Sequence, residues 1–239
     1  MVRIFAPPEC LDGDRARLDE HGHRHLIRVL RLETGDALRV FDGRGLEIDA
    51  IVEKVGKNTV ELSLGARRRL PPPVATITLL QSPPKNDRME YIVQKTTELG
   101  VSRIVPVLTR QGILKPSEDK VARWRTIAME AARQCGRADI PVVDNAIPLD
   151  QALTEVPADT LPIMLWEEER SATLRQALAG TPRQVALLVG PEGGFSQAEA
   201  DACQDRGFVR ASMGPRILRA DTAAIVAVAL AQAAAGGLD

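Results

Sequence analysis

The sequence predicts a small β-rich domain followed by an α/β domain with a mostly parallel sheet. Three observations lead to this prediction. Strand-like runs separated by hairpin signals occupy residues 36–64, a proline-rich stretch follows at residues 71–73, and strand-like and helix-like segments alternate from residue 75 onward. We therefore place the first domain at residues 1–70 and the second at residues 74–239.

Composition is that of an ordinary globular protein, with 239 residues, 44% of them hydrophobic, and a formal net charge of −1. No apolar run approaches the roughly 20 residues that cross a membrane, and the N-terminal residues lack the apolar segment of a secretory signal. The three cysteines are far apart and are expected to be free thiols. These features predict a cytoplasmic protein with no membrane partner.

The first domain is expected to contain strands at residues 2–5, 36–41, 46–55 and 59–64. Residues 24–31 fit a short helix whose apolar side chains share one face. Three arginines at i, i+4 and i+7 share the opposite face: Arg24, Arg28 and Arg31. This stripe predicts a locally basic surface on a nearly neutral protein, and ordinary solvated arginines are the competing interpretation.

Strands and helices alternate regularly in the predicted second domain, which implies a parallel sheet covered on both faces. A capping box, Ser196 with Glu199, begins one helix, and Asp221 or Thr222 is expected to cap the alanine-rich last helix. Strands are expected at residues 75–81, 104–108, 142–143, 161–166, 185–189 and 208–212, and other helices at residues 88–99, 117–135 and 173–178.

Two Gly-Pro loops follow strands of this sheet, at residues 190–194 and 213–220. Open α/β sheets bind their ligands at the carboxyl ends of strands, so these loops are the candidate site. A dinucleotide fingerprint is excluded, because Glu192 stands where a glycine is needed and Pro191 lacks an amide for phosphate. The expected ligand tolerates an acid, as a cation or an uncharged ring does; purely structural turns are the alternative.

Histidines occur only at His21, His23 and His25, and this excludes a Ser-His-Asp or Cys-His site within the second domain. The row has no cysteine and no well-placed acid, so we predict no metal site there. A polar cap that precedes the residue 24–31 helix is the favoured interpretation.

The two loops and their flanks also carry a family resemblance. LLVGPEGGFSxxE at residues 187–199 and MGPRILRADTAA at residues 213–224 resemble the motif pair of the SPOUT superfamily of RNA methyltransferases, and within it the ribosomal RNA small-subunit methyltransferase E family. Matches at residues 25–31, 95–101 and 131–137 extend the resemblance over nearly the whole chain. One departure is Asp221, where the family more usually has glutamate.

The resemblance implies a PUA-like β-barrel domain followed by a SPOUT α/β domain with a deep trefoil knot at about residues 185–235. It implies an S-adenosyl-L-methionine-dependent homodimer, with active sites at the subunit interface, that methylates N3 of a uridine in 16S rRNA, either naked or in the assembled small subunit. The implied cofactor-binding residues are Leu165, Gly190, Pro191, Glu192, Gly193, Met213, Gly214, Ile217, Leu218 and Ala220.

Methylation at uracil N3 requires loss of the N3 proton and stabilisation of the resulting anion. Arg219 is the first candidate for that stabilisation and Arg216 the second, because both flank the expected cofactor loop. Glu192 or Asp221 could accept the proton or orient the arginine, although Asp221 fits a helix cap equally well. The chemistry needs no metal.

RNA docking is expected to use basic side chains of both predicted domains, because phosphate contacts position a nucleic acid. The candidates are Arg24, Arg28 and Arg31 in the first domain, with Lys85, Arg88, Lys95, Arg110, Arg133 and Arg137 in the second. Two alternatives stay open: a SPOUT enzyme that acts on tRNA or on another rRNA position, and a non-catalytic RNA-binding module.

Overall fold

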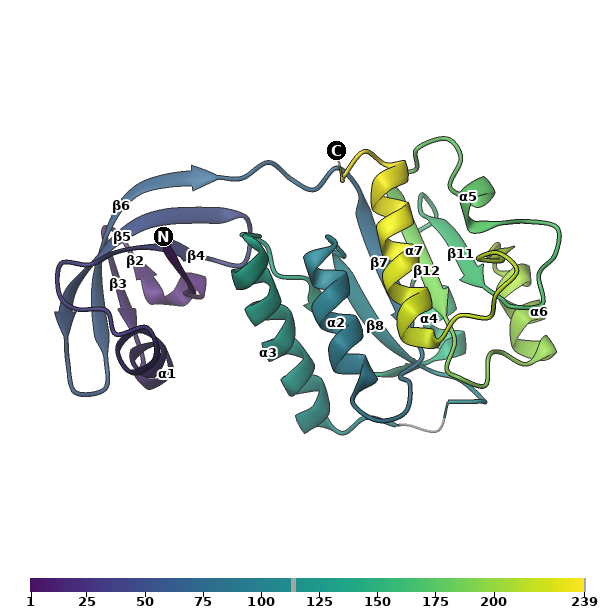
Figure 1. Ribbon diagram of the computed structural model, residues 1–239, viewed down its shortest axis with the longest axis horizontal. Coiled ribbons are helices and arrows are strands. Elements are labelled where there is room, and N and C mark those ends of the chain that lie inside the picture. The colour runs from purple at the N-terminus through teal and green to yellow at the C-terminus, as the bar shows by residue number, and fades with distance from the viewer. Residues whose placement is uncertain (113–114, 239) are drawn as a thin grey trace. The chain divides into compact units, whose positions relative to one another are not determined.

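The computed structural model describes residues 1–112 and 115–238, which divide into two compact units (Figure 1). The first unit contains Met1–Pro72 together with Ala132–Ile140, and the second contains the rest of the described chain. Each unit has its own sheet and its own buried apolar side chains. In the described part of the chain, no helix has the length and hydropathy that spanning a bilayer requires.

The sheet of the first unit has six strands in the described residues, in the order β1-β4-β5-β6-β3-β2. β1 pairs with β4 in parallel and the other pairs are antiparallel. Alternate residues of β4 and β5, such as Leu38, Val40 and Ile48, are fully buried, as expected for a sheet with one covered face. The strands are β1 (Val2–Phe5), β2 (Leu11–Asp12), β3 (Arg15–Leu18), β4 (Ala37–Phe41), β5 (Leu46–Val55) and β6 (Val60–Arg69).

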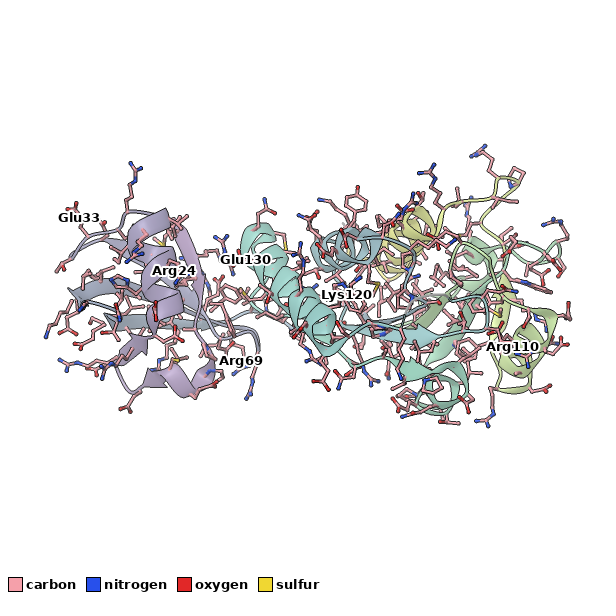
Figure 2. The ribbon with its side chains drawn as sticks, turned by 90° about the horizontal axis from the view of Figure 1, so that it is seen from below. Arg24, Glu33, Arg69, Arg110, Lys120 and Glu130 are labelled. Atoms are coloured by element: carbon pink, nitrogen blue, oxygen red, sulfur yellow. The ribbon has the colours of Figure 1, made fainter. Side chains whose placement is uncertain are left out.

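The predicted helix at residues 24–31 differs from the structure. A short α1 (Glu20–His23) continues into a π-helix, η2 (Arg24–Val29). η2 ends at Val29, so Arg31 does not share a helical face with Arg24 and Arg28, and the expected stripe of three arginines on one helix is wrong for Arg31. Arg24 and Arg28 are exposed on η2, and Arg31 lies beyond it with φ of 57° (Figure 2 labels Arg24).

The expected polar cap of this helix involves the three histidines. His23 is buried at the end of α1, and the backbone N–H of His23 donates to the Asp19 carbonyl at 2.8 Å. The His21 and His25 side chains lie outside the described residues.

A buried carboxylate, Glu47 on β5, holds three arginines of the first unit. Its oxygens lie 2.6 Å from Arg3, 2.8 Å from Arg68 and 3.7 Å from Arg39. Arg3 also donates to two backbone carbonyls near the end of α3 (Glu118–Cys135). One belongs to Arg133, in the last turn of the helix, and the other to Arg137, which follows the helix. A cation at the carbonyl end of a helix is favourable, so Arg3 ties β1 to the last turn of α3.

This network predicts a pH-dependent stability. Burial alone would raise the pKa of Glu47, but the hydrogen bonds from Arg68 and Arg3 hold that pKa below its usual value. The stabilisation is therefore present above the unfolded-state pKa of about 4.3 and is lost as pH falls through the lower folded-state pKa. We expect Glu47→Gln to lower the free energy of unfolding by roughly 1–3 kcal/mol at pH 7.

Urea denaturation at pH 7, 5, 4 and 3, followed by circular dichroism, tests the prediction. The difference between wild type and Glu47→Gln should shrink at the acid end of this series. A difference that is the same at every pH would contradict the role of the Glu47 charge.

The sheet of the second unit is parallel, with seven strands in the described residues. Its order is β10-β8-β7-β12-β11-β13, and β9 pairs with β8. The predicted alternation is confirmed, with β10 (Ile147–Pro148) and α4 (Leu149–Thr154) as additions. The strands are β7 (Thr76–Gln81), β8 (Arg103–Leu108), β9 (Val142–Val143), β10 (Ile147–Pro148), β11 (Leu161–Leu165), β12 (Gln184–Val189) and β13 (Val209–Ala211).

Helices of the second unit cover this sheet (Figure 1). The last of them, α7, packs against α2, β7 and β12. Besides α3, the helices are α2 (Arg88–Glu98), α4 (Leu149–Thr154), α5 (Leu174–Ala177), α6 (Gln197–Asp205) and α7 (Ala220–Ala234).

The start of α7 corrects a prediction. The N-cap residue is Arg219, not Asp221 or Thr222. Asp221 lies in the first turn, where its carboxylate accepts the Thr222 N–H at 3.0 Å and lies 3.6 Å from Arg88 of α2. A negative charge in a first turn is favourable, and here it also links α7 to α2.

Candidate functional site

A cavity of about 710 Å³ opens at the carboxyl edge of the second sheet. β12, β11 and β13 are adjacent and parallel, so their last residues, Val189, Leu165 and Ala211, share one edge. The loop that follows each strand lines the cavity. The strand-end rule used on the sequence therefore points to the same edge of the sheet as this cavity.

Sequence-predicted site residues gather here. All the predicted cofactor-binding residues line the cavity except Gly193, and so do Arg216 and Arg219. Gly193 instead faces the loop after β8, where a Cβ at its position would lie 3.2 Å from the Cβ of Gln111.

The loop after β11 supplies lining residues that the sequence interpretation missed, among them Trp166, Glu167 and Glu169. The signal was the same strand-end position, but the sequence interpretation applied that rule only to the two Gly-Pro loops. Trp166 forms a fixed part of the wall, because the Arg210 guanidinium lies 4.7 Å from the centre of its ring.

Charges of both signs line the cavity. Acidic lining residues include Glu167 and Glu169, and basic ones are Arg170, Arg216 and Arg219. Hydrogen bonds from the Ser171 hydroxyl and from backbone N–H groups lower the pKa of Glu169, so it is ionised at neutral pH. The cavity thus offers negative groups to a cation and positive groups to an anion.

Close packing explains one glycine of this site. A Cβ on Gly190 would lie 2.9 Å from the Phe195 ring, which is buried in the core of the second unit. The loop therefore folds back on itself, with Phe195 beneath the backbone of Gly190.

Glu192 is exposed at the tip of this loop, and its carboxylate is already engaged. Its two oxygens lie 3.1 and 3.3 Å from the backbone nitrogen of Lys85, in the loop after β7. The structure thus gives Glu192 a contact outside the cavity that the sequence could not reveal.

The predicted RNA-binding residues fall on both units. Arg133 and Arg137 belong to the first unit, although the sequence interpretation assigned them to the second domain, because the end of α3 packs with β1 through Arg3. Ion pairs engage Arg88 with Asp221 at 3.6 Å, Lys95 with Glu98 at 2.9 Å and Arg137 with Asp139 at 2.6 Å. The exposed candidates are Arg24, Arg28, Arg31, Lys85 and Arg110.

Over the described residues, no three His, Cys, Asp or Glu side chains gather in a way that could hold a metal ion.

Comparison with known proteins places the chain in a family. A family model described as an RNA methyltransferase domain matches residues 71–232, and one described as an RNA methyltransferase PUA domain matches residues 18–65. A relative from Synechocystis, named ribosomal RNA small subunit methyltransferase E, is 35% identical over 232 residues, which cover 95% of this chain and 76% of the relative. The chain belongs to the ribosomal RNA small subunit methyltransferase E family.

Other members of the ribosomal RNA small subunit methyltransferase E family match over nearly their full length. The Rickettsia conorii protein of that name is 29% identical over 95% of this chain and 93% of its own. A solved Neisseria gonorrhoeae member, described as bound to S-adenosyl methionine, is 30% identical with a TM-score of 0.89, covering 98% of this chain and 97% of its own.

A Legionella pneumophila structure, described as a putative methyltransferase in complex with the bound cofactor SAM, gives a TM-score of 0.88 at 34% identity, over 98% of this chain and 97% of its own. These matches confirm the α/β class, the PUA domain and the resemblance to the ribosomal RNA small subunit methyltransferase E family that the two loop motifs carry.

Proposed function

We propose that this chain is an S-adenosylmethionine-dependent methyltransferase that methylates N3 of a uridine in 16S rRNA of the small ribosomal subunit. The observation that carries the proposal is the cavity over β12, β11 and β13, lined by the two loop motifs, in a family with a member solved in complex with S-adenosyl methionine.

The lining residues fit this cofactor. When bound, S-adenosylmethionine supplies a methyl group attached to a positively charged sulfur. It carries two cationic groups and no phosphate, which suits a cavity lined by the acidic residues Glu167 and Glu169 and without a phosphate loop. Apolar side chains of Leu165, Met213 and Leu218 face the same cavity and suit an uncharged adenine ring.

Arg219 would stabilise the uracil anion formed when N3 loses its proton, and Arg216 is the second candidate. Both line the cavity, and the backbone of Arg219 forms the N-cap of α7. Glu192 ranks below them, because its carboxylate accepts the Lys85 N–H and is less available as a base. Asp221 is paired with Arg88 and does not line the cavity.

The finer fold assignment belongs to the same proposal. Residues 1–70 would form a PUA-like β-barrel domain that docks RNA, and residues 74–239 a SPOUT domain with a trefoil knot at about 185–235. The knot follows from the resemblance that the two loop motifs carry, and the last helix, α7, packs on β7 and β12 (Figure 1).

A homodimer with active sites at the subunit interface would complete the cavity. Ile217 supports this, because it lines the cavity and yet is 86% exposed, which is unusual for an isoleucine at a binding site. A second subunit would cover this side chain.

Small subunits from a strain that lacks this protein, incubated with the enzyme and labelled cofactor, test the proposal. Mass-spectrometric mapping should find one new N3-methyluridine in 16S rRNA. Methylation of tRNA alone would favour a different SPOUT substrate. Absence of cofactor binding by calorimetry would favour a non-catalytic RNA-binding module.

RNA binding should depend strongly on salt, because the exposed Arg24, Arg28, Arg31, Lys85 and Arg110 would displace counterions from phosphates. We expect affinity for small-subunit rRNA to fall roughly 20- to 500-fold between 50 and 200 mM salt, for three to five such contacts. Filter binding over this range measures the slope, and a flat slope would argue against a basic docking surface.

A further inference from the structure

Two glutamates of the segment 190–199 bind backbone N–H groups of loops that follow other strands. Glu192 accepts from Lys85, in the loop between β7 and α2. Glu199, in the first turn of α6, accepts from Arg110, in the loop after β8, at 2.7 Å. The cofactor loop is thereby bonded to the two neighbouring loops that carry the exposed Lys85 and Arg110 side chains.

The Glu199 carboxylate caps a helix and also makes a second contact. One carboxylate oxygen accepts from the Ser196 N–H at 2.9 Å and the Ser196 hydroxyl at 2.7 Å, which completes the capping box. The other oxygen is not needed for the cap, and it reaches Arg110, 89 residues away in sequence. Glu199 is only 8% exposed, so both interactions are shielded from water.

Packing fixes the Arg110 loop from two more sides. Gly193 faces Gln111 so closely that a Cβ on the glycine would lie 3.2 Å from the Cβ of Gln111. The hydroxyl of Thr109 lies 2.9 Å from that of Ser82, at the end of β7. The backbone around Arg110 is therefore held between the cofactor loop and the β7 loop, while the Arg110 side chain is exposed (Figure 2 labels Arg110).

We propose that Glu199 is a positioning residue for rRNA methylation: by holding the Arg110 backbone against the cofactor loop, it places the Arg110 guanidinium to bind an RNA phosphate beside the methyl-transfer cavity. Glu192 holds Lys85 in the same way. The inference rests on the proposed function, because it takes RNA as the ligand of Arg110. It makes the cofactor loop part of the RNA-docking surface.

A double-mutant cycle tests the proposal with Glu199→Ala, Arg110→Ala and the double variant. We expect each single variant to raise KM for small subunits about tenfold, the loss of one charge-assisted contact, with cofactor affinity within about threefold of wild type. The double variant should be no worse than Arg110→Ala within about twofold. Fully additive effects would overturn the proposal, as would an equal loss of cofactor affinity in Glu199→Ala.

Two controls separate positioning from capping. Ser196→Ala breaks the capping box but leaves the Arg110 contact in place, so we expect a KM within about twofold of wild type. Asp205→Ala removes an exposed carboxylate from the same helix and should also leave KM unchanged. A Ser196→Ala enzyme with the same KM defect as Glu199→Ala would mean that Glu199 acts only as a cap.

Hydrogen exchange in the wild-type protein keeps the test valid if Glu199→Ala fails to fold. The Arg110 amide should exchange as slowly as the amides of α6, although the residue is on an exposed loop. Fast exchange would overturn the contact itself. This measurement needs no RNA, so failure of wild type to methylate small subunits would count against the proposed function alone.

Discussion

Arg219→Ala is expected to lower kcat for methylation of small subunits at least about a hundredfold, the usual cost of removing a group that stabilises a developing anion. Affinity for S-adenosylmethionine should stay within a few-fold of wild type, because the exposed Arg219 side chain is only one part of a cavity formed by three loops. Single-turnover kinetics with saturating cofactor, together with calorimetry, separates the two effects.

Two variants serve as controls for this prediction. Arg219→Lys keeps the positive charge and should recover part of the rate. Arg175→Ala removes an exposed arginine of α5 that does not line the cavity, and should behave as wild type. If Arg219→Ala turns over at the wild-type rate, Arg219 has no part in the chemistry, and Arg216 becomes the first candidate.

Gly190→Ala is expected to weaken S-adenosylmethionine binding roughly 5- to 150-fold, since overpacking costs typically 1–3 kcal/mol. The new methyl group would lie 2.9 Å from the Phe195 ring. The ring is buried in the core, so the loop must move instead and the cavity wall moves with it. The backbone of Gly190 is outside the left-handed region, so the requirement for glycine is steric.

A second substitution that restores cofactor binding would test this prediction further. Phe195→Leu shortens the side chain beneath Gly190, so the double variant Gly190→Ala/Phe195→Leu should bind the cofactor more tightly than Gly190→Ala alone. Calorimetry on all three variants measures the recovery. If the double variant binds no better, Phe195 is not the obstacle.

The parts of the fold that were predictable follow from local pattern. Buried parallel strands give continuous apolar runs, as in β12, and amphipathic helices give a 3.6-residue period, as in α2. The π-helix η2 was not predictable in this way, because apolar spacing alone does not reveal the hydrogen-bond register. β3 alternates polar and apolar residues as a half-buried strand does, but it was missed because a run of four residues is too short for the alternation to stand out.

Only those parts of the candidate site that lie at strand ends or within the two sequence motifs could be predicted from the sequence. The rule for strand ends located the loops after β12 and β13 and applied equally to Trp166 after β11, but on the sequence it was used only for the two Gly-Pro loops. Contacts between distant segments leave no local signal. The bonds from Glu192 to Lys85 and from Glu199 to Arg110 each join loops that only the sheet order brings together.

The sheet order also determines how long one strand edge stays unpaired while the protein is being synthesised. β7 pairs with β8 on one side and with β12 on the other, and β12 follows roughly a hundred residues later. At about 5–20 residues per second, translation leaves one edge of β7 open for roughly 5–20 seconds. Nascent chains of this protein therefore expose an aggregation-prone edge until the strand that precedes the cofactor loop has emerged.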